Sequence, residues 1–282
     1  MTSCASWRRL ATASTRSRGC EMGGCAVIIQ ARLGSSRLPG KVLKPLAGRT
    51  VLAHVLERAR AISGIDVVCC AVPEGVADDP VADEARRLGV HVFRGSEKDV
   101  LDRYVRAARE LSADVVMRVT SDCPAIDPAV CGGVLAALID RNADYASNNT
   151  PPSWPHGLDC EAVRFSWLER SAREATLPSQ REHVTPYVRG HPDVRQAHYP
   201  CPVAGLAEYR WTLDTARDYD FLCALFERLP PGPEGWDYRA ALAVVDANPD
   251  LRAINAGQDR YAGLKKSLAE DGKGPLGTGG PR

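Results

Sequence analysis

Three positively charged residues, two glycines and two serines fall within a single ten-residue segment, residues 32–41 (RLGSSRLPGK). Glycine lets the backbone adopt positive φ and approach a ligand closely, and consecutive backbone N–H groups can surround an anion. The side chains of Arg32, Arg37 and Lys41 add positive charge that suits a triphosphate. The segment therefore predicts a phosphate-binding loop, with a solvated basic turn as the alternative.

This loop differs from the P-loop of nucleotide triphosphatases. That motif requires Gly-x-x-x-x-Gly-Lys-Ser/Thr. Here five residues separate Gly34 from Gly40, and Val42 stands where a hydroxyl residue would hold Mg²⁺. No Gly-x-Gly-x-x-Gly follows a predicted strand, so a dinucleotide-binding fold is disfavoured as well.

Two aspartates, Asp122 and Asp214, lie at the ends of predicted strands, residues 114–119 and 208–213. Mg²⁺ prefers oxygen ligands and often takes one or two carboxylates, while substrate phosphates and water complete its shell. With the phosphate-binding loop, this pair predicts a site in which Mg²⁺ and the basic side chains bind the phosphates of a substrate. Helix capping is the alternative role for either aspartate.

Polar residues elsewhere suit a second substrate. Asp159 and Glu161 are two positions apart, so both side chains point to one face if the segment is extended. Carboxylates there could bind sugar hydroxyls or act as a base, and a solvated strand face is the alternative. Arg118 and Arg210 lie near the carboxyl ends of predicted strands, where each could hold an acceptor carboxylate or neutralise a buried acid.

The elements that must position these residues alternate between strand and helix. This order predicts an α/β fold with a largely parallel sheet and helices on both faces. Ligands in such sheets bind beyond the carboxyl ends of the strands, so functional residues should follow Ala31, Val72, Val119 and Leu213. We expect strands at 25–31, 65–72, 90–93, 114–119, 157–165 and 208–213, a loop at 145–155, and helices at 50–62, 79–88, 96–111, 127–140, 179–186, 215–229 and 236–245.

Composition narrows the function classes. The formal net charge of the 282 residues is +1, which does not favour a nucleic-acid or membrane-surface protein, and no apolar run approaches the roughly 20 residues that span a bilayer. Ten cysteines without a Cys-x-x-Cys pair predict free thiols in a reducing cytoplasm. Residues 1–22 lack the apolar region of a secretory signal, so we expect a disordered tail or a misassigned start there and a second disordered tail at 269–282.

Five motifs in order give the chain a family resemblance: residues 31–41 (ARLGSSRLPGK), 118–128 (RVTSDCPAIDP), 155–161 (PHGLDCE), 181–187 (REHVTPY) and 210–215 (RWTLDT). Together they resemble the cytidylyltransferases, which include the acylneuraminate type of CMP-sugar-acid synthetase and, most similar, the spore-coat polysaccharide (SpsF-like) type. The resemblance implies one three-layer α/β/α domain at residues 23–268, with a mostly parallel mixed sheet of the nucleotide-diphospho-sugar transferase (GT-A-like) type.

The resemblance also implies a function. That function is the Mg²⁺-dependent transfer of CMP from CTP to a sugar or a nonulosonate-like sugar acid, in surface polysaccharide or glycoconjugate biosynthesis. An acceptor hydroxyl group would attack the α-phosphorus of CTP, and pyrophosphate would be released. Because related enzymes are commonly homodimers, the resemblance also implies a possible homodimer. No nucleic-acid or membrane partner is expected. The expected residues are Arg32, Lys41, Asp122 and Asp214 for catalysis, the two aspartates for the metal, Ala31, Arg32, Leu33, Gly34, Ser35, Arg37, Lys41, Arg118 and Ser121 for the nucleotide, and His156, Asp159, Glu161, Arg181, His183 and Arg210 for the acceptor.

Two other functions are open to this sequence. A glycosyltransferase of the same fold would need an Asp-x-Asp motif at a strand end, and the one such motif, Asp218-Tyr219-Asp220, falls in a predicted helix. A non-catalytic nucleotide-binding protein would bind CTP without turnover. Physical reasoning alone also leaves open the base of the nucleotide and the identity of the acceptor.

Overall fold

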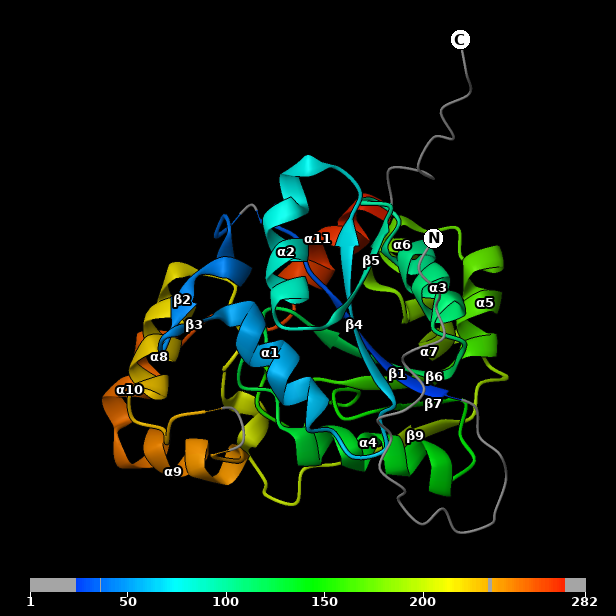
Figure 1. Ribbon diagram of the computed structural model, residues 1–282. Helices are drawn as coiled ribbons and strands as arrows, with labels where there is room; N and C mark the ends of the chain where they lie inside the picture. Colours follow the sequence, from blue (N-terminus) through cyan, green and yellow to red (C-terminus); the bar gives the residue numbers. More distant parts are fainter. Residues whose placement is uncertain (1–23, 36, 233–234, 272–282) are drawn as a thin grey trace, which may run out of the picture.

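A mixed seven-stranded sheet forms the centre of the molecule (Figure 1). The structure is a computed structural model that describes residues 24–35, 37–232 and 235–271. The predictions for residues 1–22 and 272–282 therefore lie outside the described residues. The strand order is β5-β4-β1-β6-β8-β7-β9, formed by β1 (Gly24–Gln30), β4 (Val67–Pro73), β5 (His91–Gly95), β6 (Ala113–Thr120), β7 (Tyr145–Ser147), β8 (Glu161–Arg164) and β9 (Gln196–His198).

Strand β8 is antiparallel to both of its neighbours, β6 and β7, whereas the other pairings in this sheet are parallel. The prediction of a mostly parallel, mixed sheet is therefore confirmed. Parallel strands end at the same edge of a sheet, so the loops that follow β1, β4 and β6 all emerge on one side. A small hairpin of β2 (Pro45–Leu46) and β3 (Arg49–Thr50) lies outside this sheet.

Helices cover both faces of the sheet, which gives the predicted three layers (Figure 1). Each face of the sheet has its own hydrophobic core, and alternate side chains of β1 pack into one core or the other. Val27 and Ile29 belong to the same core as Leu52, while Ala26 and Ile28 belong to the same core as Leu101. On the first face lie α1 (Val51–Arg60), α2 (Asp79–Arg87) and α4 (Pro128–Asp140), and on the second lie α3 (Val100–Glu110), α5 (Phe165–Glu174) and α7 (Pro186–Gly190).

A third core lies at the flank of the sheet, where α8 (Ala216–Phe226), α9 (Tyr238–Ala247) and α10 (Pro249–Ile254) form a group (Figure 1). Two fully buried tryptophans, Trp154 and Trp211, belong to this core. The last described helices are α6 (Pro178–His183) and α11 (Ala262–Asp271). Helix α11 ends three residues beyond the expected domain boundary at 268, and the Asp271 carboxylate accepts hydrogen bonds from the Ser179 backbone N–H and hydroxyl at 2.8 and 2.6 Å.

Several predicted helix starts shift in the structure. Asp99, not Ser96, caps α3, because its carboxylate accepts from the Asp102 N–H at 2.9 Å. Ser179 lies inside α6 rather than at its start. Pro186 begins α7, where its missing N–H has no consequence.

Two segment predictions are wrong. Residues 145–147, expected in a loop, form β7, because their backbone pairs with β8 and β9 and the three residues are buried. Residues 208–213, expected as a strand, contain the end of the 3₁₀ helix η4 (Leu206–Glu208) and a segment with one isolated β-bridge, between Arg210 and His156. The Trp211 N–H donates to the His156 carbonyl at 2.6 Å, and the Leu213 N–H donates to the Asp122 carbonyl at 2.8 Å. These bonds, rather than a strand of the sheet, position the segment that precedes Asp214.

Gly157 permits this close approach. Its φ is +117°, and a Cβ there would lie 2.5 Å from the Trp211 carbonyl carbon and 2.7 Å from the Thr212 nitrogen. We expect Gly157→Ala to destabilise the fold by about 2 kcal/mol or more, because it adds backbone strain and an overpacked contact. Thermal unfolding followed by circular dichroism measures this, with Gly190→Ala as the control because open space surrounds that position. Equal midpoints for the two variants would contradict the expectation.

None of the helices among the described residues is long and apolar enough to cross a membrane.

Candidate active site

The Lys41 ammonium joins the two aspartates that the sequence singled out. Its Nζ donates hydrogen bonds to Asp122 Oδ2 at 2.8 Å, to Asp214 Oδ1 at 2.9 Å and to the Leu213 carbonyl at 2.7 Å. Lys41 follows β1 and Asp122 follows β6, which is the parallel neighbour of β1. The three side chains therefore meet at the carboxyl edge of the sheet, as expected for a ligand site in this fold.

The loop before Lys41 is held in place by the turn after β4. Asp78, at the end of the 3₁₀ helix η3 (Val76–Asp78), accepts a hydrogen bond from the Leu33 N–H at 2.6 Å. The Leu33 carbonyl accepts in turn from the Gly40 N–H at 3.1 Å, which closes the loop. Gly40 has a φ of 67°, a conformation that glycine adopts without strain. The short helix η2 (Lys41–Leu43) begins directly after it.

A second set of charges holds Asp214. Arg37 Nη2 lies 3.0 Å from Asp214 Oδ1, and Arg210 Nη2 lies 3.3 Å from Oδ2. Arg210 is anchored by the fully buried Asp218, with bonds of 2.7 and 2.9 Å. Asp218 Oδ2 also accepts from the Asp214 N–H at 3.0 Å. Arg210 and Asp218 therefore fix the orientation of the Asp214 carboxylate rather than contacting a ligand themselves.

The charges in this cluster stabilise one another. Burial alone would raise the pKa of Asp122, but the Lys41 charge and hydrogen bond outweigh it and hold the pKa well below its usual range. Burial would likewise lower the pKa of Lys41, yet Asp122 and Asp214 raise it. Asp122 and Lys41 are therefore both ionised at neutral pH. Two carboxylates that converge on one cation form an oxygen-rich site of the kind that suits a divalent ion.

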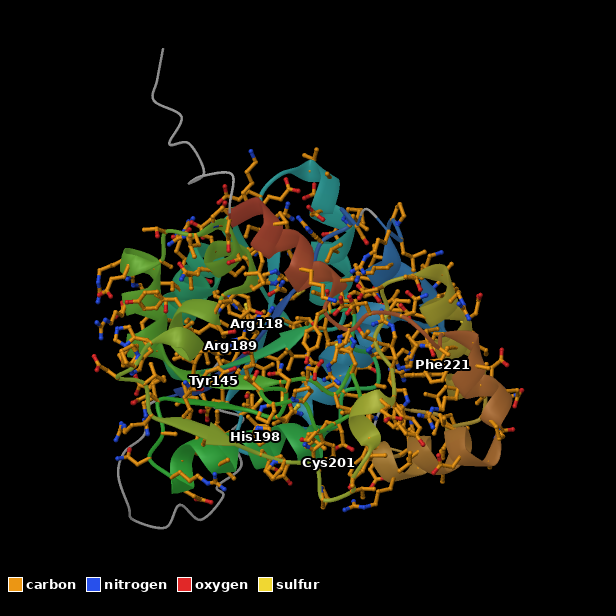
Figure 2. The ribbon with its side chains drawn as sticks, turned by 180° about the vertical axis from the view of Figure 1, so that it is seen from behind. Arg118, Tyr145, Arg189, His198, Cys201 and Phe221 are labelled. Atoms are coloured by element: carbon orange, nitrogen blue, oxygen red, sulfur yellow. The ribbon has the colours of Figure 1, made fainter. Side chains whose placement is uncertain are left out.

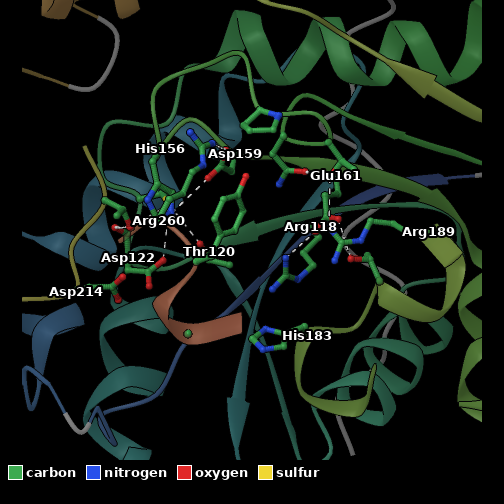
Figure 3. A pocket seen from close by; sticks show the side chains of 18 of the residues that line it. Arg118, Thr120, Asp122, His156, Asp159, Glu161, His183, Arg189, Asp214 and Arg260 are labelled. Atoms are coloured by element: carbon green, nitrogen blue, oxygen red, sulfur yellow. Dashed lines mark hydrogen bonds and ion pairs between the residues drawn. The ribbon is translucent and has the colours of Figure 1, made fainter. Parts of the chain in front are cut away.

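A cavity of about 470 Å³ opens beside this cluster (Figure 3). One end is lined by Asp122, Asp214, His156, Asp159 and Arg260, and Figure 3 shows these side chains close together. The opposite end is lined by Arg118, Glu161, His183 and Arg189. A cavity of this size holds a small ligand.

Asp159 and Glu161 both line the cavity, as their spacing predicted, but they differ in environment. The Glu161 side chain is 3% exposed and accepts hydrogen bonds from Arg118 Nη1 at 2.7 Å, from the Thr185 hydroxyl at 2.7 Å and from the Tyr145 hydroxyl. Figure 2 labels Arg118, Arg189 and Tyr145, which lie in the same part of the molecule. Burial would raise the pKa of Glu161, but Arg118 and Arg189 lower it below its ordinary value. Glu161 is therefore an ionised structural anchor for Arg118, whereas Asp159 faces the cavity.

The two histidines of the cavity are neutral at pH 7. Burial lowers the pKa of His156, whose Nε2 lies 3.7 Å from Asp159 Oδ2. Burial, followed by the Arg118 charge, lowers the pKa of His183. Each imidazole can therefore donate or accept a hydrogen bond without adding charge.

Several residues singled out in the sequence do not line this cavity. Arg32 is half-exposed and lies 3.8 Å from Glu97. Arg181, expected near the acceptor, donates instead to the Asp99 carboxylate and to the Ala172 carbonyl, so it ties α6 to the start of α3. Lys41 and Arg210, described above, also lie outside the cavity lining. The same holds for the buried residues Ala31 and Ser121, and for Leu33, Gly34 and Ser35 of the loop.

Sequence reasoning missed several cavity residues, among them Thr120, Arg189, Arg260 and Tyr261. Thr120 ends β6, and its position two residues before Asp122 was a usable signal. Arg189 lies in α7 and Arg260 and Tyr261 precede α11, all outside the strand ends that the fold directs attention to. Only the tertiary structure brings these three residues to the site.

Comparisons with known proteins identify the family. Residues 26–226 match the sequence profile of the cytidylyltransferases. The chain is 34% identical to the spore coat polysaccharide biosynthesis protein SpsF of Bacillus subtilis over 238 residues, which cover 81% of this chain and 97% of SpsF. A 3-deoxy-manno-octulosonate cytidylyltransferase of Anaeromyxobacter dehalogenans is 40% identical over 116 residues, which cover 40% of this chain and 46% of that protein.

A solved structure agrees. A cytidylyltransferase from Leptospira borgpetersenii superimposes with a TM-score of 0.77 at 31% identity and covers 83% of this chain and 98% of its own. The profile match spans both β1 and β6 with Lys41 and Asp122, and it includes Asp214. The chain therefore belongs to the cytidylyltransferase family and is a nucleotidyltransferase.

Proposed function

We propose that this protein transfers CMP from CTP to a sugar or sugar acid, with Mg²⁺ and with release of pyrophosphate, in the biosynthesis of a surface polysaccharide or glycoconjugate. One observation carries the proposal. Asp122 and Asp214 converge on Lys41 at the carboxyl edge of the sheet, directly beside a cavity that can hold a second substrate.

Positive charge at one end of the site suits a triphosphate. Lys41 and Arg37 both pair with Asp214. Both cations can stabilise the negative charge that accumulates on phosphate oxygens as pyrophosphate leaves. Asp122 and Asp214 would hold a divalent ion, and their carboxylate oxygens fit the preference of Mg²⁺. Bound there, the ion would neutralise phosphate oxygens. The protein's own contribution is then mainly to hold the two substrates in line.

The end of the cavity farther from Asp122 and Asp214, which we call the remote end, suits an acidic acceptor. Arg118 and Arg189 are opposed there by one carboxylate, Glu161, so one positive charge is in excess. Arginine binds a carboxylate through two parallel hydrogen bonds. The names of the two relatives, a spore coat polysaccharide biosynthesis protein and an octulosonate cytidylyltransferase, support a sugar or a sugar acid as acceptor.

The glycosyltransferase alternative is disfavoured by the environment of its only candidate motif. Asp218 and Asp220 lie within α8, and the Asp218 carboxylate is occupied by Arg210 and by the backbone at the start of the helix. It is fully buried and does not line the cavity. The by-product separates the two activities, because a glycosyltransferase would release a free nucleotide rather than pyrophosphate.

The test is to incubate the protein with CTP, Mg²⁺ and a panel of acceptors while pyrophosphate is measured. The panel holds N-acetylneuraminate, 3-deoxy-manno-octulosonate and neutral hexoses. We expect release with at least one member, loss of release on chelation with EDTA, and its return with added Mg²⁺. CTP binding without release on any member would favour a non-catalytic nucleotide-binding protein instead.

Replacing Arg189 should affect acidic acceptors selectively. Arg189→Ala removes the excess positive charge at the remote end, and we expect the KM for a sugar acid to rise about tenfold or more. The KM for CTP should stay within about twofold. Initial rates at varied acceptor concentration measure both, and Arg141→Ala, an exposed arginine at the end of α4, serves as control. An equal loss with neutral and acidic acceptors would contradict the role of Arg189.

A further inference from the structure

The chain that follows α10 runs along the cavity and closes one side of it. We call residues 257–271 the clasp. Its Arg260, Tyr261 and Gly263 line the cavity, and its helix α11 packs against α6. Figure 3 labels Arg260, which lies beside Asp159. The clasp lies beyond residues 26–226, the part of the chain that matches the family profile.

We propose that the clasp forms the acceptor-binding wall of the cavity and that Arg260 and Tyr261 select the acceptor by contacting its hydroxyl groups. This inference rests on the proposed function, and it names the residues that bind the second substrate.

Arg260 is fixed at the edge of the cavity by three segments of the chain. Its Nη2 donates to Asp159 Oδ1 at 2.6 Å, and its Nη1 donates to the carbonyls of Trp154 and Ala207 at 3.1 and 3.2 Å. The other oxygen of Asp159, Oδ2, lies 3.7 Å from His156 Nε2, too far for a strong hydrogen bond. A sugar hydroxyl both donates and accepts hydrogen bonds. The Asp159 carboxylate can accept one and the Arg260 guanidinium can donate one, so the pair offers both partners.

The clasp also holds the opposite end of the cavity. Ser267 Oγ lies 2.9 Å from His183 Nε2 and 2.8 Å from Glu182 Oε2. The single hydroxyl proton is needed by the carboxylate, so His183 Nε2 must be the donor to Ser267. The clasp thus fixes the orientation of one cavity-lining imidazole directly, and through Arg260 it fixes Asp159 as well. Displacing it would change both ends of the acceptor space at once.

Arg260 lines the same end of the cavity as Asp122 and Asp214, but the bonds described for Lys41 and Arg37 involve no residue of the clasp. Lys41 is held by Asp122, Asp214 and the Leu213 carbonyl, and Arg37 is paired with Asp214. All of these groups lie within the first 214 residues. A change in the clasp should therefore affect the acceptor and spare CTP.

The first experiment compares Arg260→Ala with Lys265→Ala in the full chain, using the acceptor that turns over fastest in the panel. Lys265 is the matched control, because it carries the same charge on the same segment but pairs with Asp259 at an exposed position. We expect Arg260→Ala to raise the KM for the acceptor about tenfold or more, the scale of a hydrogen bond to a charged group. The KM for CTP should change less than about twofold in both variants.

A second variant keeps the test independent of folding. Tyr261 is 43% exposed, so Tyr261→Ala removes a cavity wall without opening a hole in the core. We expect the same selective rise in acceptor KM. In addition, the ratio of kcat/KM between the best acceptor and the next panel member should fall.

Three outcomes separate the hypotheses. A selective rise in acceptor KM for both Arg260→Ala and Tyr261→Ala supports the clasp. Unchanged acceptor KM in an active variant at either residue, or an equal rise in the KM for CTP, overturns it while leaving the proposed function intact. An absence of pyrophosphate release by the wild-type protein with every panel member overturns the proposed function itself, and the clasp with it.

Discussion

Asp122→Ala should lower kcat by on the order of 10²-fold or more, the scale for removing one major electrostatic element of a site. Asp122 contacts Lys41 directly and, by the proposal, provides one of two carboxylates for the divalent ion. The loss should fall on kcat more than on the acceptor KM, because the remote end of the cavity is built from other residues. Pyrophosphate release at saturating CTP and Mg²⁺ measures it.

The fold should survive this substitution. Lys41 keeps its bonds to Asp214 and to the Leu213 carbonyl, so its charge stays paired. Asp220→Ala is the matched control, since that aspartate is exposed on α8 and belongs to the Asp-x-Asp sequence of the alternative function. Near-normal turnover of Asp122→Ala, or a large loss with Asp220→Ala, would refute the assignment.

Glu161→Ala should cause the largest loss of stability, about 3–5 kcal/mol, because it leaves Arg118 without its partner in a buried position. It also removes the acceptor for the Tyr145 and Thr185 hydroxyls. Urea unfolding at pH 7 measures the effect. Glu110→Ala is the control, since its hydrogen bond with His91 is exposed and should contribute less than about 1 kcal/mol.

The contribution of Glu161 should depend on pH in a defined direction. Its pKa is lower in the folded protein than the ordinary value of about 4.3. A carboxylate of this kind contributes stability above its unfolded pKa, and the contribution is lost as the pH falls through the folded pKa. The difference in unfolding free energy between the wild type and Glu161→Gln should therefore narrow below about pH 4. A constant difference from pH 7 to pH 3 would argue against an ionised Glu161.

The sequence by itself determined the parts of the site that follow strands. Residues 32–41 and Asp122 come directly after apolar runs that form β1 and β6, and parallel strands must end at the same edge. Local patterning therefore sufficed to place Lys41 near Asp122. The helix starts at Asp127 and Thr215 were also readable, because a capping side chain acts within three residues of the N-terminus.

Only the tertiary structure decided the rest. Asp214 reaches the site without the predicted strand, through bonds from Trp211 and Leu213 to distant segments and through the close approach that Gly157 allows. Arg260 meets Asp159 from 101 residues further along the chain. No periodicity in the sequence encodes such contacts, because they depend on how irregular segments pack around a finished core. Asp214, Asp159 and Arg260 are brought to the cavity by contacts of this kind, whereas Lys41 and Asp122 follow strands of the sheet.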